Sequence, residues 1–279
     1  MDEKLQKVLA RAGVGSRREM ERWIEQGRVK VNEQVASIGD RVSDTDSIKV
    51  DNKPIHLKRT QVQQRVIAYH KPVGEVCTRD DPEGRTTIFK NLPRLKTGRW
   101  ISVGRLDLNT SGLLLLTTDG ELANKLMHPS SEVEREYAVR VLGEVSPDII
   151  KQLKTNVPLD DGDAHFTDVK ESGGQGANHW YHVVLKEGRN REVRRLWEHF
   201  GFAVSRLMRI RYGNITLERR LRPSKSEDLT EKEMEILYKS VGLEYTAPEV
   251  MPKKDKSRFK ANKNPNRSVY KGKPSGNRR

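Results

Sequence analysis

Apolar residues at the start of the chain follow a helical spacing. They recur every three or four positions from residue 5 to residue 12, which predicts a short helix that ends at Gly13. Ser16 and Glu19 have the spacing of a capping box, so a second helix should begin there and continue to Gly27. Alternating apolar and basic residues then predict two short strands, at residues 29–31 and 48–50.

A longer series of elements follows in the middle of the chain. An apolar strand at residues 66–69 should end in a turn, because Pro72 follows it. Four consecutive leucines occupy positions 113–116, which predicts a strand that is buried on both faces. Asp119 can then cap a helix that has to stop before Pro129.

Two basic segments lie near the end of this series. Positions 193, 196, 197 and 200 are apolar and form one stripe of an amphipathic helix. Arg194 borders this stripe, whereas Arg195 points nearly opposite and should be solvated or in contact with RNA. In the stretch 205–212, strand alternation places Arg209 and Arg211 together on one side. Such a row either binds the phosphates of a substrate or consists of solvated charges paired with acids, and the pattern favours neither.

The positive charge of the chain is unevenly distributed. The protein has 279 residues and a net charge of +14. Residues 251–279 contain 11 Lys and Arg and one acidic residue, and residues 1–62 contain 13 and 10. Residues 63–250 contain 29 and 28, so their net charge is only +1. The last segment has few apolar residues, and we expect a disordered arm that neutralises phosphates, although a solubilising tail has the same composition.

Composition argues against several classes of protein. The longest apolar run is far shorter than the ~18 residues of a membrane span. The N-terminus lacks the apolar segment of a secretory signal. Cys77 is the only cysteine, which favours a reducing compartment. We therefore expect a cytoplasmic protein without membrane contact, whose partner is a polyanion, nucleic acid first.

Basic residues cluster where the two predicted N-terminal helices meet. Arg17, Arg18 and Arg22 lie there, and a solvated face on which they pair with nearby acids is one reading. Three segments, however, are similar to the S4 RNA-binding domain: residues 5–13, 16–18 and 27–29. That family binds structured RNA through the basic face of its paired helices. The resemblance implies RNA contact for the three arginines.

A second resemblance begins at one aspartate. Residues 104–114 read Gly-Arg-Leu-Asp-x-x-Thr-x-Gly-Leu-Leu. An aspartate in a loop most often caps a turn, but this spacing resembles the catalytic motif of pseudouridine synthases, in the branch typified by the ribosomal small-subunit enzyme A. The resemblance implies that Asp107 is the nucleophile. It also implies that Arg105 can fill the gap left by a flipped nucleotide.

Two further segments follow the same family pattern in order. In residues 134–139 the family's active-site tyrosine falls on Tyr137, which otherwise reads as an ordinary core aromatic. In residues 188–196 the family's basic partner of the aspartate falls on Arg194, which the helical wheel selects independently. The three catalytic candidates are therefore Asp107, Tyr137 and Arg194.

Together the resemblances imply an α+β protein in three parts. A small S4-like αα-β module should occupy residues 1–62. A pseudouridine-synthase domain on a mostly antiparallel mixed sheet with flanking helices should occupy residues 63–248. A disordered basic tail should occupy residues 249–279.

The implied activity is the isomerisation of uridine to pseudouridine in ribosomal RNA. The enzyme has to flip its target nucleotide out of the folded RNA. Several segments are similar to family members that act on large-subunit 23S ribosomal RNA or its assembly intermediate, and 16S ribosomal RNA is the alternative. Because the product is an isomer, we expect no cofactor and no metal, and we expect a monomer. A non-catalytic RNA-binding assembly factor and a metal-dependent nuclease are alternatives from other classes.

Overall fold

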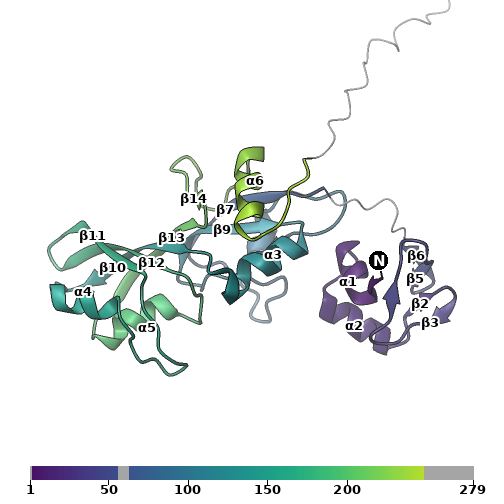
Figure 1. The fold of residues 1–279 in the computed structure, drawn as a ribbon, viewed down its shortest axis with the longest axis horizontal. Helices are drawn as coiled ribbons and strands as arrows, with labels where there is room; N and C mark the ends of the chain where they lie inside the picture. Colours follow the sequence, from purple (N-terminus) through teal and green to yellow (C-terminus); the bar gives the residue numbers. More distant parts are fainter. Residues whose placement is uncertain (1, 56–62, 248–279) are drawn as a thin grey trace, which may run out of the picture. The chain divides into compact units, whose positions relative to one another are not determined.

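The computed structural model describes residues 2–55 and 63–247 of the chain (Figure 1). The basic tail expected at residues 249–279 lies outside these ranges. Both expected domain boundaries fall beside positions that are not described, so they stay predictions. Within the described ranges, none of the helices combines the length and the apolar character needed to cross a membrane. The protein is α+β, as predicted.

The first range folds into two helices and two small antiparallel sheets. In chain order its elements are β1 (Glu3–Lys4), α1 (Leu5–Arg11), α2 (Arg17–Glu25), β2 (Val29–Val31), β3 (Gln34–Val35), β4 (Arg41–Val42), β5 (Ile48–Val50) and β6 (Lys53–Ile55). One sheet has the order β3-β2-β5-β6, and β1 pairs with β4. The predicted capping box is present, because Ser16 Oγ accepts from the Glu19 N–H and the Glu19 carboxylate accepts from the Ser16 N–H. The apolar stripes of both helices form a common core in which Leu5, Met20 and Val29 are fully buried.

The second range is built on one nine-stranded sheet. Its strands are β7 (Val66–Lys71), β8 (Ile101–Ser102), β9 (Ser111–Thr117), β10 (Arg135–Leu142), β11 (Asp168–Gln175), β12 (Asn178–Leu185), β13 (Val204–Tyr212), β14 (Ile215–Thr216) and β15 (Ser226–Asp228). The order is β11-β12-β10-β13-β9-β7-β15, with β14 beside β13 and β8 beside β9. Among the described strands only β13 and β9 pair in parallel, so the sheet is mixed and mostly antiparallel, as predicted.

The helices of this range flank the sheet. They are α3 (Gly120–Met127), α4 (Pro147–Leu153), α5 (Glu192–His199) and α6 (Glu231–Ser240), with short 3-10 helices at Ile88–Asn91 and Pro129–Ser131. Figure 1 shows α4 and α5 beside the part of the sheet that contains β10 and β12, and α3 and α6 beside β7 and β9. Asp119 caps α3 through the N–H groups of Glu121 and Leu122, and α3 ends before Pro129, as predicted.

Strand β9 lies between two apolar layers. Leu114 and Leu116 join the cluster that contains residues of α5, whereas Leu113 and Leu115 join the cluster that contains residues of α3 and α6. All four side chains are fully buried, which confirms the prediction for the leucine run. The loop before β9 therefore leads directly into the packed interior.

A β-bulge interrupts β13 at Ile210. Tyr137 on β10 pairs with Arg209, but the adjacent Glu136 pairs with Arg211, so the residue between them is extra. An extra residue shifts the alternation of side chains, and it places Arg209 and Arg211 on opposite faces. Arg209 is 2% exposed, whereas Arg211 is half-buried and forms an ion pair with Glu136. The prediction that the two arginines share one side is wrong, because it assumed unbroken alternation.

Candidate active site

Asp107 lies in the loop that joins β8 to β9. Its side chain is half-buried, whereas Arg105 is exposed. The N–H of Thr110 donates to the carbonyl oxygen of Asp107 at 3.0 Å, which closes a tight turn directly before β9. This turn sets the direction in which the Asp107 carboxylate leaves the backbone.

Gly112 fixes the position of this turn against β13. It pairs with Arg209 across the parallel contact between β9 and β13. Its φ is +107°, and a Cβ at this position would lie 2.2 Å from the carbonyl oxygen of Arg209. Only glycine tolerates both this backbone angle and so close an approach of another strand. The glycine of the motif therefore brings the Asp107 loop and Arg209 together.

Lys71, at the end of β7, binds the backbone of this turn. Its side chain is fully buried, and its Nζ donates to the carbonyl oxygens of Pro72, Asp107 and Thr110 at 3.0, 3.0 and 2.9 Å. Burial lowers the pKa of Lys71, and the charges of Cys77, Glu75 and Asp107 oppose this effect. Lys71 is not among the site residues predicted from the sequence, although a lysine at the end of an apolar strand indicates a buried cation.

A cavity of about 750 Å³ opens beside the Asp107 loop. Four residues predicted from the sequence line it: Arg105, Asp107, Tyr137 and Arg209. Tyr137 and Arg209 are direct neighbours on β10 and β13, and they are 7% and 2% exposed. The volume is within the range of small-ligand pockets, roughly 300–1,000 Å³. The cavity can therefore take up a nucleoside next to a carboxylate.

Arg194 holds the backbone of the Asp107 loop. It is 7% exposed, as the helical wheel predicts. Its Nη2 donates to the carbonyl oxygen of Asn109 and its Nη1 to that of Val204, both at 2.9 Å. Among the described residues no ion pair joins Arg194 to the Asp107 carboxylate, so the expected direct pairing is not observed, and Arg194 instead contacts the neighbouring backbone. Burial lowers the pKa of Arg194, the charge of Arg191 adds to this effect, and the nearby Asp107 opposes it.

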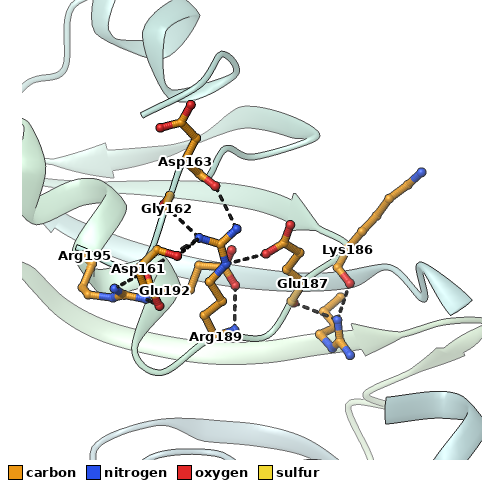
Figure 2. Close-up of polar contacts among 9 residues, drawn as sticks. Asp161, Gly162, Asp163, Lys186, Glu187, Arg189, Glu192 and Arg195 are labelled. Atoms are coloured by element: carbon orange, nitrogen blue, oxygen red, sulfur yellow. Dashed lines mark hydrogen bonds and ion pairs between the residues drawn. The ribbon is translucent and has the colours of Figure 1, made fainter. Parts of the chain in front are cut away.

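Residues 160–163 form an acidic turn before β11, and this turn binds two other arginines, Arg189 and Arg195 (Figure 2). Arg195 Nη1 lies 2.7 Å from Asp161 Oδ1, and this bond lowers the pKa of Asp161. Arg189 donates to the carbonyl oxygens of Gly162 and Asp163, both at 2.8 Å. Arg195 is therefore half-buried and paired with a residue 34 positions earlier in the chain rather than free in solvent, and its contact with RNA stays a prediction.

The contacts of Arg189 anchor residues 186–191, which line the cavity. Arg135 is 8% exposed, and its Nη1 donates to the carbonyl oxygens of Lys186 and Glu187 at 2.5 and 2.7 Å. The Glu192 carboxylate accepts from the Arg189 N–H at 3.0 Å (Figure 2). Burial raises the pKa of Glu192, and this hydrogen bond partly offsets the effect. Arg135, Arg189 and Glu192 lie within the motifs at residues 134–139 and 188–196, but the sequence did not indicate these roles.

The remaining candidates lie away from the cavity lining. Arg211 bonds to Glu134 and Glu136 on the face opposite Arg209, so the expected basic row is absent from the described part of β13. Arg17, Arg18 and Arg22 are exposed on α2 in the first range.

Two family models match the chain. The model described as RNA pseudouridylate synthase matches residues 65–199, and the model of the S4 domain matches residues 3–48. The first match contains the Asp107 loop, β10 and α5, and the second contains both helices of the first range.

Known proteins are similar over most of the chain. A protein of Pseudomonas aeruginosa named ribosomal large subunit pseudouridine synthase B is 59% identical over 247 residues, which are 88% of this chain and 64% of that protein. The chain thus spans less than two thirds of this relative. A protein of the same name from Yersinia pestis is 55% identical, over 94% of this chain and 84% of that protein. A crystal structure of a pseudouridylate synthase aligns with a TM-score of 0.59 and 26% identity, over 84% of this chain and 99% of the other.

Proposed function

The chain belongs to the RNA pseudouridylate synthase family, and we propose that it isomerises specific uridines in large-subunit ribosomal RNA, with Asp107 as the nucleophile. The observation that carries the assignment of residues is the single cavity that Arg105, Asp107 and Tyr137 line together. The large-subunit target is supported by the names of relatives that are 55–59% identical to this chain. The placement in the branch typified by the small-subunit enzyme A stays a prediction from the sequence.

The proposed chemistry needs a carboxylate beside a nucleoside. The bond between C1′ of the ribose and N1 of uracil has to break, and a bond between C1′ and C5 has to form. An ionised carboxylate can act as the nucleophile that holds one fragment while the other turns. Lys71 and Arg194 support this role of Asp107, because both cations interact with its charge and both bind the backbone of its loop.

Tyr137 and Arg105 are proposed to act on the flipped nucleotide. Tyr137 lines the cavity with an aromatic ring, and every base has a face on which such a ring can stack. Arg105 is exposed at the rim, so its side chain is free to enter the space that the nucleotide leaves in the RNA.

RNA binding is proposed to extend to the S4 domain. Arg17, Arg18 and Arg22 are exposed on one helix and can contact phosphates without any rearrangement of the module. We further propose that the protein acts as a monomer in the cytoplasm, where ribosomal RNA is assembled. The tail of residues 251–279 adds a second basic segment by composition.

The decisive experiment compares wild type with Asp107→Asn on large-subunit ribosomal RNA from a strain that lacks the gene. Chromatography of the digested nucleosides should show new pseudouridine with wild type and none with the variant. A gel-shift assay should show similar RNA binding by both, since the substitution keeps the size of the side chain. Pseudouridine formation by Asp107→Asn would refute the role of the carboxylate. Modification confined to small-subunit RNA would refute the proposed target.

A further inference from the structure

Arg209 is the most deeply buried charged residue that lines the cavity. It is 2% exposed, in the middle of a nine-stranded sheet. A buried guanidinium is costly unless its N–H groups find acceptors. Nε of Arg209 donates to the carbonyl oxygen of Leu113 at 2.8 Å. Its Nη2, in contrast, has no hydrogen-bond partner among the described residues.

The fold places this side chain in the cavity by two local devices. The bulge at Ile210 turns Arg209 to the face that Tyr137 shares. Gly112 then lets the backbone of Arg209 press against the start of β9, one turn after Asp107.

The wall around Arg209 has further free hydrogen-bonding capacity. Thr110 Oγ1 is buried, lines the cavity as part of a residue that is 2% exposed, and also has no partner among the described residues. The guanidinium of Arg209 lies 5.1 Å from the centre of the Tyr212 ring, which orients its plane. An unpaired donor and an unpaired hydroxyl, both buried and both on residues that line one cavity, indicate a ligand with a polar edge.

We propose that Nη2 of Arg209 donates a hydrogen bond to O4 of the flipped uracil and stabilises the negative charge that this oxygen gains during the reaction. The inference rests on the proposed function and deepens it. If the C1′–N1 bond breaks first, its electron pair passes to the uracil, where N1, O2 and O4 share the charge. If Asp107 instead adds to C6, the charge passes through C5 to O4. When C5 bonds to C1′, the bond that Asp107 had formed, to C1′ on the first route or to C6 on the second, breaks and releases the carboxylate. C5 then loses its proton and N1 gains one, so the ring is neutral. O4 carries charge on both routes, so a fixed donor there assists either one.

The test first locates a uridine that wild type modifies in large-subunit ribosomal RNA. It then uses a synthetic RNA fragment that spans this position, with either uridine or 4-thiouridine there. Sulfur is a weak acceptor, so wild type should isomerise the thio-RNA more slowly. Arg209→Met keeps the length of the side chain and its contact with Tyr212 but has no donor. This variant should be slower than wild type on the uridine RNA by about 10²- to 10³-fold. Its ratio of the rates for uridine and 4-thiouridine should be at least tenfold smaller than that of wild type.

Two controls separate this role from a structural one. Arg140→Met removes an arginine that also faces an aromatic ring of the same sheet, that of Trp180, but lies outside the cavity lining. It should leave both rates unchanged. Arg209→Lys keeps a donor, and it should retain the sensitivity to 4-thiouridine even if its rate falls. Circular dichroism of each variant checks folding.

The outcomes are distinct. Equal rate ratios for wild type and Arg209→Met would overturn the proposal and leave Arg209 as a cation packed on Tyr212. If Arg209→Met does not fold, the ratio for Arg209→Lys decides instead, and it is read in the opposite direction. The lysine still offers a donor, so retained sensitivity to 4-thiouridine is expected, and loss of the sensitivity in this folded variant would refute the contact. If wild type forms no pseudouridine in the uridine RNA, the proposed function fails, whatever the Arg209 variants do.

Discussion

The arginines of α2 and the cations around the Asp107 loop are the same residue types in opposite settings. Arg17, Arg18 and Arg22 are exposed on one short helix. Lys71 and Arg194, together with Arg135 and Arg209, are at most 8% exposed, and each donates to backbone carbonyl oxygens. The exposed group is available to an external polyanion. The buried group binds the backbone around one cavity.

This difference explains why net charge does not locate the chemistry. Residues 63–250 carry 29 basic and 28 acidic residues, yet the cavity lies there. Exposed charges act at a distance and are screened by salt. A buried cation acts on atoms it touches, and its desolvation has to be offset by fixed acceptors. The two settings therefore predict different responses to substitution.

The largest effect is expected at Lys71. Lys71→Met leaves three buried or part-buried carbonyl oxygens without their shared donor, and a fully buried acceptor left unpaired costs about 1–3 kcal/mol. Denaturant unfolding should show a fall in the free energy of unfolding on the order of 3 kcal/mol, and pseudouridine formation should be lost. Lys154→Met, at an exposed ion pair with Asp168, is the matched control and should change stability by less than about 1 kcal/mol. Equal losses of unfolding free energy in Lys71→Met and Lys154→Met would contradict the distinction between buried and exposed cations.

The next effect separates two adjacent arginines of α5. Arg194→Ala frees the carbonyl oxygen of Asn109 and with it the loop of Asp107. A displacement of about 1 Å at a reacting group can cost about 10²-fold in rate, and we expect a loss of this size in single-turnover measurements. Arg195→Ala removes an ion pair with Asp161 outside the cavity lining and should cost less than about fivefold. Similar losses from both would show that position along the helix does not decide the role.

Local patterns were sufficient to predict α1, α2, α3 and α5 and several strands, including β9. The capping box at Ser16, the cap at Asp119 and the buried leucines of β9 depend on neighbours within a few residues. The mixed sheet itself was inferred from family resemblance, because strand order depends on contacts between distant segments. The helical wheel also predicted correctly that Arg194 is buried, because a helix keeps one period throughout.

Residues whose roles depend on distant contacts were the ones missed. The bulge at Ile210 depends on how β13 pairs with β10, so alternation gave the wrong face for Arg209. Lys71 meets the Asp107 turn 36 residues further along the chain. Arg195 meets Asp161 across 34 residues. No spacing rule connects such positions, and only the folded backbone brings them together.

A smaller effect is expected in the first range. Replacing Arg17, Arg18 and Arg22 together by alanine removes three exposed charges, while the buried residues of the module are untouched. If each contacts one phosphate, the slope of log affinity for RNA against log salt should fall by about 2, at roughly 0.7–0.9 per contact. The rate at saturating RNA should not change, since no bond at the cavity is altered. An unchanged slope would mean that these arginines form a solvated face.

The smallest effect tests whether burial or a hydrogen-bond partner determines the direction of the pKa shift of Glu192, which lines the cavity. Burial raises the pKa of Glu192, so in wild type its stabilising contribution is complete below the unfolded value of about 4.3 and is lost as the pH rises through the folded pKa. Glu192→Gln keeps an acceptor for the Arg189 N–H but does not ionise. Its free energy of unfolding relative to wild type should therefore increase from pH 4 to pH 7.

Asp161→Asn is the matched opposite of Glu192→Gln. The bond from Arg195 lowers the pKa of Asp161, so wild type gains stability from this group above the unfolded pKa and loses it as the pH falls through the folded value. Relative to wild type, Asp161→Asn should therefore lose stability as the pH rises from 2 to 5, the reverse of the trend for Glu192→Gln. Parallel trends in urea unfolding series for the two variants would contradict the distinction, because burial and a bound cation shift a carboxyl group in opposite directions.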